Sequence, residues 1–463
     1  MTPPSRGAAR GPASPPASVG GMTSSDSAAA PSESDLDETA IIARDLIRFD
    51  TSNYGDGKAE PEREAAEYVA ARLRDLGLEP ELIDSDPGRT SVVARVAGED
   101  RERGALVVHG HLDVVPAIAD NWSVDPFGGV IKDGMLWGRG AVDMKNMDAM
   151  MITALQEIIT SGRAPERDLI MGFFSDEEAG GVLGSAYVVE NRPEWFAGAT
   201  EAISEVGGYS IDLAGKRAYL LQTGEKALIW IRLVATGTAG HGSQVNRDNA
   251  VTRLAGAVAR IGMEEWPVHL TDTTRQLLDE IARIVGADPK QVTPDDLAIA
   301  TGTASKFIAA TLRTTTNPTL LAAGYKHNVI PDTAEALVDI RVLPGEEDQV
   351  LARVRELAGE GVEVRIVHQD VGLENPFDGP LVDAMVATLG THDPDAEVLP
   401  YMLSGGTDNK ALSLLGITGY GFAPLKLPAS MDFPAMFHGV DERVPLDALV
   451  FGRQVLRDLL LTY

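Results

Sequence analysis

The sequence predicts an α/β protein with a mostly parallel sheet, interrupted by an inserted α+β domain. In the first half of the chain, short apolar runs alternate with amphipathic helical runs, the order that builds parallel βαβ units. After Gly224 the pattern changes to alternation of apolar and polar residues, as in a half-exposed strand. The α/β pattern returns near residue 372. We therefore expect three regions, 36–223, 224–370 and 371–463, of which the first and third form one domain.

In the first region, apolar residues at helical spacing predict two helical runs within 36–79, the second of which stops at Gly77. The run at 105–109 is apolar enough for a strand that is buried on both faces of a sheet. A helix at 144–160 and a strand at 169–175 complete a βαβ unit with it. Further strands are expected at 91–96, 201–203 and 218–221.

The inserted region begins with an alternating strand at 226–236 and continues through a small α+β unit. The predicted order is β-α-β-β-α-β. Its later elements are a helix at 249–261, a strand pair within 325–342, a helix at 347–357 and a strand at 362–368. Residues 264–318 are predicted as mixed helix and loop, and the pattern assigns them no role. The last element of the chain is a helix at 446–461.

Composition excludes several classes of function. The 463 residues are enough for two domains, and 44% of them are hydrophobic, as in ordinary globular proteins. The net charge of −29 argues against a nucleic-acid or anionic membrane partner, because both need a basic surface. No apolar run reaches the roughly 18 residues of a membrane-spanning helix. Because the chain has no cysteine, a metal site must use histidine and carboxylate ligands.

Residues 1–34 are rich in Pro, Ser, Ala and Gly. They lack the continuous apolar stretch of an export signal, so we predict a disordered leader. Met22 is an alternative start to Met1. A cytoplasmic location is the default expectation.

Histidine and acidic residues follow several predicted strands, where α/β sheets place their active sites. The first group is His109-Gly-His111-Leu-Asp113. In a His-x-Asp step on extended backbone both side chains point to one face, so Asp113 can orient the ring of His111 as a metal ligand. His109 lies on the same face, so alternation does not choose between the two histidines.

Two further groups contain carboxylates. Asp143 follows a glycine-rich turn just before a helix, where capping of the helix is the alternative function. Glu177 and Glu178 belong to three adjacent acids that follow an apolar strand. Such carboxylates repel one another unless a cation lies among them, and a solvated acidic turn is the alternative. Glu205 and His438 stand in similar short strings, each uninformative alone.

Taken together, these strings resemble the dinuclear zinc amidohydrolases (metallopeptidase family 20), which include aminoacylases, carboxypeptidase G, succinyl-diaminopimelate desuccinylase and several dipeptidases. The matching strings are HGHLDVVP (109–116), GRGAVDMK (138–145), SDEEAGG (175–181), ISEVGG (203–208), AGHGS (239–243), HNVIP (327–331) and FHGVDERV (437–444). The resemblance implies a phosphorylase/hydrolase-like zinc peptidase domain. It also implies that the inserted domain is a lid and a dimerisation unit.

The resemblance implies a role for each matching residue. The implied metal ligands are His111, Asp143, Glu178, Glu205 and His438. They would hold two Zn²⁺ ions per subunit, with Co²⁺ or Mn²⁺ as alternatives, and Asp143 would bridge the two ions. Asp113 would orient His111, which leaves His109 as a structural residue. Glu177 would be the general base that activates a water shared by the metals.

Further residues are implied in substrate binding. His241 would reach across a homodimer, formed through the inserted domain, to stabilise the oxyanion of the reaction. Arg341 would grip a substrate carboxylate, for which its planar fork is suited, although an ordinary exposed arginine is the alternative. Asn328 would offer a binding amide. Gly405, Gly406 and Thr407 would form a substrate loop whose backbone amides hold an anion.

The implied activity is hydrolysis of a peptide or amide bond next to a free carboxylate, as in a dipeptidase or a carboxypeptidase. The alternative is an amidohydrolase that releases the acyl group of an N-acyl amino acid with the same metal centre. A third hypothesis, a catalytically silent binding protein, is disfavoured because the base and all five ligands are present. Segment 264–318 is longer than in small family members, and Met144 replaces an aspartate found in some relatives.

Overall fold

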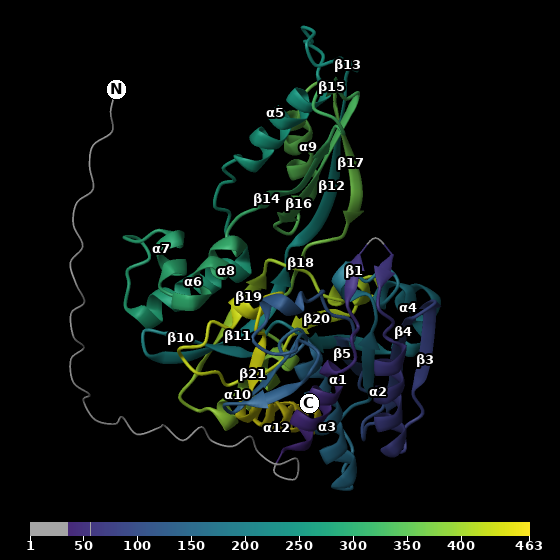
Figure 1. The fold of residues 1–463 in the computed structure, drawn as a ribbon. Helices are drawn as coiled ribbons and strands as arrows, with labels where there is room; N and C mark the ends of the chain where they lie inside the picture. The colour runs from purple at the N-terminus through teal and green to yellow at the C-terminus, as the bar shows by residue number, and fades with distance from the viewer. Residues whose placement is uncertain (1–35, 56) are drawn as a thin grey trace, which may run out of the picture.

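The fold is that of a computed structural model, which describes residues 36–55 and 57–463. The predicted leader at 1–34 lies outside the described residues. Figure 1 shows a large lower body and a narrower upper arm built around a second sheet. Among the described residues, no helix combines the length and the apolar character that crossing a membrane requires.

The lower body contains a ten-stranded sheet, called the large sheet below. Its central neighbours β20, β9, β5 and β8 run parallel, and antiparallel strands extend both edges. The mostly parallel centre predicted from the sequence is confirmed. The strands are β3 (Glu81–Asp86), β4 (Arg89–Val96), β5 (Ala105–His111), β8 (Leu169–Phe174), β9 (Ala199–Ser204), β10 (Tyr209–Leu213), β11 (Lys216–Glu225), β18 (Leu373–Glu374), β19 (Glu397–Leu403) and β20 (Thr418–Gly421).

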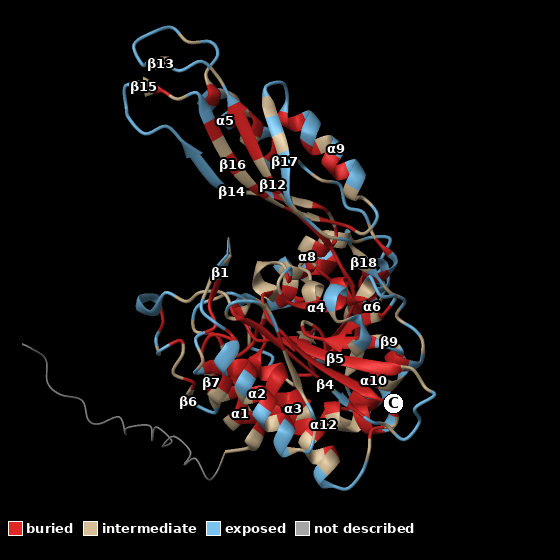
Figure 2. Cartoon of the chain, turned by 90° about the vertical axis from the view of Figure 1, so that its right-hand side faces the viewer, coloured by how far each residue is buried: buried red, intermediate tan, exposed pale blue. Residues whose placement is uncertain are grey.

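Helices cover both faces of the large sheet, because its central strands are apolar on both sides. All seven residues of β5 are buried. Leu106 and Val108 join the core under α1, α2, α3 and α12, whereas Ala105 and Val107 join the core under α4 and α11. These helices are α1 (Glu38–Ile47), α2 (Arg63–Asp75), α3 (Lys145–Thr160), α4 (Ser185–Asn191), α11 (Asn409–Ser413) and α12 (Leu446–Thr462), and α10 (Pro380–His392) packs beside α12. Figure 2 shows the resulting buried centre.

The upper arm is a four-stranded antiparallel sheet, called the small sheet, with the order β14-β16-β12-β17. One face packs against two helices, and the exposure of β16 alternates residue by residue, as the sequence predicts for a half-exposed strand. The elements are β12 (Ala227–Thr236), α5 (Ala250–Gly262), β14 (Thr315–Ala323), β16 (Thr333–Val342), α9 (Glu347–Ala358) and β17 (Val362–Gln369). Their order is the predicted β-α-β-β-α-β.

The middle of segment 264–318, which the sequence pattern assigned no role, packs on the lower body, whereas Trp266 and the start of β14 belong to the arm. It contains α6 (Asp272–Val285), α7 (Pro294–Ile299) and α8 (Ser305–Thr311). Leu277 and Ile281 of α6 and Ile308 of α8 are buried in the core of the large sheet, and α6 lies against β19. The chain therefore crosses between the two sheets four times, near residues 226, 263–271, 312–315 and 370–373.

Several elements differ from the sequence prediction. Within 36–79 the two helical runs are separated by a hairpin of β1 (Asn53–Gly55) and β2 (Lys58–Ala59). The edge strands β3 and β10 were not predicted. Of the strand pair predicted within 325–342, β16 lies in that range, but its partner β14 (Thr315–Ala323) ends before residue 325, so the prediction for this strand is wrong. A three-stranded sheet of β6 (Val130–Lys132), β7 (Met135–Trp137) and β21 (Arg443–Pro445) was also missed.

Candidate metal centre

Five histidine and acidic side chains meet at the carboxyl ends of the parallel strands. His111 is the last residue of β5, Glu178 lies in the 3-10 turn after β8, and Glu205 follows β9 directly. Asp143 lies just before α3, and His438 lies in the loop before β21. The parallel centre of the large sheet brings the first three together, because neighbouring parallel strands end at the same edge.

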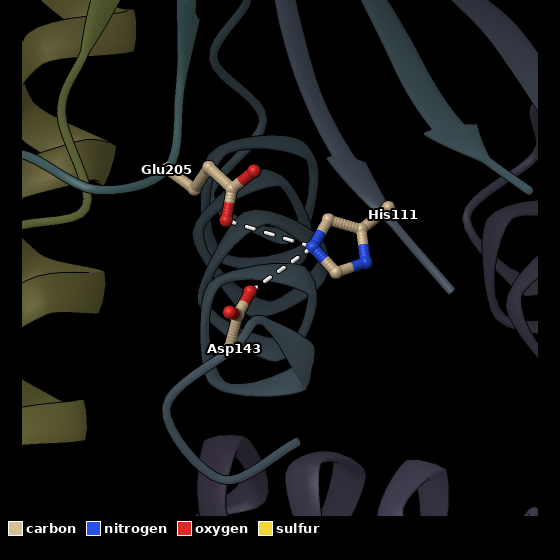
Figure 3. Close-up of side chains that lie close together, drawn as sticks. All are labelled: His111, Asp143 and Glu205. Atoms are coloured by element: carbon tan, nitrogen blue, oxygen red, sulfur yellow. Dashed lines mark hydrogen bonds and ion pairs between the residues drawn. The ribbon is translucent and has the colours of Figure 1, made fainter. Parts of the chain in front are cut away.

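The first group of potential ligands is His111, Asp143 and Glu205, all of them buried. Figure 3 shows the two carboxylates converging on one ring nitrogen. Nε2 of His111 lies 3.1 Å from Oδ1 of Asp143 and 3.5 Å from Oε2 of Glu205. Three side chains whose ligand atoms lie this close can hold one cation.

The second group is Asp143, Glu178 and His438. Nε2 of His438 lies 3.3 Å from Oδ2 of Asp143 and 3.1 Å from Oε2 of Glu178. Asp143 thus offers one carboxylate oxygen to each group. Among the described residues these are the two groups that could hold a metal ion, and they share one side chain.

The donor set fits a pair of divalent cations. Imidazole and carboxylate ligands suit Zn²⁺, and a shared carboxylate between two three-residue groups is the geometry of a two-metal site. Burial raises the pKa of Glu205 to about 8 and also raises that of Glu178. Buried acids that would otherwise take up protons are kept ionised by nearby cations. The five ligands implied by the sequence are therefore brought together by the fold.

Glu177 belongs to neither ligand group, although it lies beside both. Its Oε2 is 3.8 Å from Nε2 of His111, and its side chain lines the cleft above the centre. Burial raises its pKa well above the usual value for a glutamate. A carboxylate with a raised pKa next to the reacting atoms is suited to accept a proton and return it.

Asp113 supports the centre differently from the expectation. Nδ1 of His111 is 2.9 Å from the backbone carbonyl oxygen of Asp113, whereas the Asp113 carboxylate is 3.6 Å away. That carboxylate instead accepts hydrogen bonds from the backbone N–H groups of Glu177 and Glu178, at 3.0 and 3.1 Å. It also accepts from the amide of Asn53 at 2.9 Å. Asp113 therefore fixes the turn that carries Glu177 and Glu178.

Asn53 and Glu442 are supporting residues that the sequence analysis missed. Glu442 is fully buried and accepts hydrogen bonds from the backbone N–H groups of Val142 and Asp143, at 2.5 and 3.0 Å. It also accepts from Arg139 and from the N–H of Gly140. The loop before α3 is thus held by Glu442, which follows His438 by four residues. The position of Glu442 in the string FHGVDERV was the one sequence feature that indicated its importance.

His109 belongs to neither ligand group. Its ring is fully buried, and Nε2 lies 3.0 Å from the side-chain oxygen of Asn409. Burial lowers its pKa to about 4, so the ring is neutral at neutral pH. A Cβ at position 110 would meet the Asp148 carboxylate and the end of Met144, so one or both of these buried side chains would have to shift.

A cleft of about 590 Å³ opens above the centre and is lined by residues from both sheets. Arg341, Gly405, Gly406 and Thr407 line it, as implied for substrate-binding residues. Arg341 forms a two-point ion pair with Asp339, at 2.7 and 3.0 Å. The N–H and hydroxyl of Thr407 donate to the buried Glu225, at 3.0 and 2.6 Å, so this N–H is not available to a substrate.

His241 and Asn328 lie away from this cleft. His241 lies in β13 (Gly240–His241), which pairs with β15 (Val329–Ile330) at the far tip of the arm, and Asn328 directly precedes β15 (Figure 1). Both side chains are exposed, and Nδ1 of His241 is 2.8 Å from the hydroxyl of Ser243. The fold of one chain therefore does not bring these two residues to its own metal centre.

Comparison with known proteins finds relatives along most of the chain. Aminoacylase-1 of Sus scrofa is 27% identical over 421 residues, which cover 87% of this chain and 90% of that protein. The N-fatty-acyl-amino acid synthase/hydrolase PM20D1 of Xenopus tropicalis is 26% identical over 412 residues, covering 84% and 78% respectively.

Solved structures show the same fold. An M20 family metallo-carboxypeptidase of Sulfolobus solfataricus, Sso-CP2, superposes with a TM-score of 0.72 at 19% identity, covering 92% of this chain and 99% of that chain. A dinuclear metal-binding peptidase of Bacillus subtilis gives 0.56 at 14% identity, covering 91% and 96%.

The profile of peptidase family M20/M25/M40 matches residues 107–462, which include every ligand of the two groups. This span is more than three quarters of the chain. The chain belongs to peptidase family M20/M25/M40 and is a metal-dependent hydrolase.

Proposed function

We propose that this enzyme hydrolyses a peptide or amide bond next to a free carboxylate, using two divalent cations. The observation that carries the proposal is the sharing of Asp143 between two groups of ligands, with Glu177 beside them. His111 and Glu205 would complete one site, and Glu178 and His438 the other. Zinc is the metal we expect, because no thiolate is present and imidazole with carboxylate suits it.

When bound, the two ions supply an acidified water and a polarised scissile carbonyl. The side chains of the chain do the rest. Glu177 accepts a proton from the attacking water and passes it to the leaving amine. Asp113 and Glu442 hold the turns that carry Glu177, Glu178 and Asp143, so the base meets the reacting atoms in a fixed geometry.

Substrate binding involves both sheets. We assign the substrate carboxylate to Arg341 and to the loop of Gly405 and Gly406, which line the same cleft. Asp339 already engages Nε and Nη2 of this guanidinium, so the substrate carboxylate would meet its Nη1 side. Thr407 supports the loop through Glu225 rather than by direct contact.

We propose that the enzyme is a homodimer and that the arm with the small sheet is a lid and dimerisation unit. His241 and Asn328 lie at the exposed tip of the arm, far from the centre of their own chain. A second copy that places this tip over the first copy's cleft would supply His241 as the donor to the developing oxyanion and Asn328 as a binding amide. The cytoplasmic location stays a prediction from the sequence.

The test is a panel of dipeptides and N-acyl amino acids, assayed with the purified protein loaded with Zn²⁺, Co²⁺ or Mn²⁺. We expect the enzyme to hydrolyse the amide bond of substrates that have a free carboxylate. It should not hydrolyse the same amide bond when that carboxylate is a methyl ester. Elemental analysis should find two metal ions per chain. A protein that binds no divalent metal, or that hydrolyses nothing in the panel, would refute the proposal.

A further inference from the structure

The cleft has two chemically different parts. Its floor carries the metal ligands, Glu177 and Asp408, whereas much of its wall is apolar. Three aromatic side chains dominate that apolar part, namely Trp230, Phe307 and Phe437, and they are called the aromatic wall below. They come from three distant stretches of chain, the small sheet, segment 264–318 and the loop of His438.

Phe307 is held firmly in this wall. Its ring stacks on Phe437 at 6.3 Å with an interplanar angle of 2°, and on Tyr401 of β19 at 5.6 Å and 23°. Next to it in α8, Ile308 is buried in the core of the large sheet. Phe307 is nevertheless only half-buried, so part of its ring faces the cleft.

Trp230 extends the apolar lining on the open face of β12. Its ring lies 5.2 Å from that of His368 on β17. His368 in turn borders Gly180, in the turn after Glu177 and Glu178, so closely that a Cβ on that glycine would lie 3.1 Å from Cε1. Residues of the small sheet thereby close the cleft beside the catalytic turn.

The aromatic wall cannot receive the carboxylate of a substrate. An ionised carboxylate buried against aromatic rings would lose its bound water and would gain no hydrogen-bond donor in return. Donors that Phe307 and Phe437 lack are offered by the glycine loop and by Arg341, which pairs with Asp339 opposite Trp230 at the other end of the aromatic wall. The acyl group lies on the other side of the scissile bond from the carboxylate. It is therefore the part of the substrate that would contact the aromatic wall.

Resting on the proposed function, we propose that the preferred substrate is an N-acyl amino acid with a bulky apolar acyl group packed against the aromatic wall. Phe307 is the residue that sets the size of acyl group accepted. Segment 264–318 thus serves as a specificity element, because it delivers this ring to the cleft.

The experiment compares N-acyl derivatives of one amino acid, from acetyl through butanoyl and hexanoyl to octanoyl and benzoyl, with matched dipeptides. For the metal-loaded wild type we expect kcat/KM to rise by roughly fourfold for each methylene buried, until the wall is covered. In Phe307→Ala, kcat/KM for the hexanoyl and benzoyl substrates should fall about tenfold or more, whereas that for the acetyl substrate changes little.

Two further variants separate specificity from damage. Phe307→Trp keeps the stack but narrows the cleft, so it should reject the octanoyl substrate selectively. Lys306→Ala is the matched control, because this exposed neighbour in α8 does not line the cleft. It should reproduce the wild-type profile. Metal content is measured for each variant, since Phe437 adjoins the ligand His438.

The outcomes are distinguishable. The inference would be refuted if kcat/KM of the wild type did not depend on acyl size. It would also be refuted if kcat/KM of Phe307→Ala depended on acyl size in the same way as that of the wild type. Either result would leave the proposed function intact. If Phe307→Ala lost metal and its kcat/KM fell equally for all substrates, Phe307 would be a support for His438. This result would also refute the inference. If Phe307→Ala responded to the amino-acid side chain instead of the acyl group, the assignment to the acyl side would be wrong. Failure to hydrolyse any amide would refute the proposed function itself.

Discussion

At the scale of single residues, Glu177 and Glu178 are neighbours in the chain but serve different purposes. Oε2 of Glu178 lies with His438 in a ligand group, whereas Glu177 stays outside both groups. Their backbone N–H groups are both held by the carboxylate of Asp113. In the proposed function, Glu178 would therefore be presented to a metal and Glu177 to the attacking water.

Glu177→Gln should lower kcat by about 10²–10⁴-fold, because the amide cannot accept the proton of the attacking water. Both metal ions should remain bound, since Glu177 is not one of the ligands. The measurement is steady-state hydrolysis together with elemental analysis, and Glu190→Gln, an exposed position on α4, is the control. Undiminished turnover would show that another group is the base.

Glu442→Gln should weaken metal binding about 10–100-fold, as is typical when support of a ligand is removed. The carboxylate accepts four hydrogen bonds from the loop that carries Asp143, and the amide can accept fewer. Titration of the metal-free protein with Zn²⁺ checks this, with the exposed Asp432→Asn as control. Equal affinities for the Glu442 variant and the wild type would contradict the role.

The ligand residues could be predicted because they stand in recognisable strings at strand ends, and the fold brings all five together. The support of these ligands could not be predicted. Whether His111 bonds to the side chain or to the backbone of Asp113 depends on the turn of the main chain after β5, which spacing does not encode. Asn53 was missed because it lies in a hairpin 60 residues from its partner.

At the scale of elements, α3 begins directly behind the metal centre and contains an unpaired acid. Asp148 is fully buried, and neither carboxylate oxygen has a hydrogen-bond partner among the described residues. Burial raises the pKa of Asp148 to about 8. The folded state therefore holds a proton that the unfolded state releases near pH 4, and stability is lost as the pH rises from 4 toward 8.

Asp148→Asn should remove this pH dependence. Relative to the wild type, the variant should gain on the order of 2–4 kcal/mol of unfolding free energy near pH 7.5, and the gain should shrink toward zero near pH 4. Thermal or urea unfolding of the metal-free proteins at both pH values measures it, because histidine and carboxylate ligands would release metal near pH 4. A gain of the same size at both values would exclude titration of Asp148 as its cause.

Strongly patterned elements were predictable, and weakly patterned ones were not. β5 is a continuous apolar run and α3 is a long, mostly apolar segment, and both appear close to their expected bounds. The edge strands β3 and β10 carry polar residues such as Asp84 and Asp212, which hide the strand period. The packing of α6 on the large sheet is a long-range contact, which no local pattern specifies.

At the scale of the whole molecule, the distance between His241 and the metal centre of the same chain makes a prediction about assembly. If the partner's arm completes each site, His241→Ala and Glu177→Gln subunits should each be inactive alone but complement each other when mixed. Random reassociation gives heterodimers with one functional site, so about a quarter of the wild-type activity should return.

Light scattering should report a dimer. As a control, homodimers of each variant are crosslinked before mixing so that subunits cannot exchange. This mixture should stay inactive. Activity that does not recover after verified exchange would show that His241 does not act across subunits. A monomer of full activity would exclude the dimer altogether.

The four crossings between the sheets bear on how the arm can move. Two connections would act as a pivot and would allow the arm to swing and to twist. Four connections join the arm to the lower body along a broad line. They involve α5, α6, α8, β14 and the ends of β12 and β17. Twisting would shear the core that anchors α6 and α8, so bending about the line of the crossings is the soft direction that remains. We expect such a bend to move Trp230 toward or away from Phe307, so that motion of the arm would change the cleft width available to the proposed acyl group.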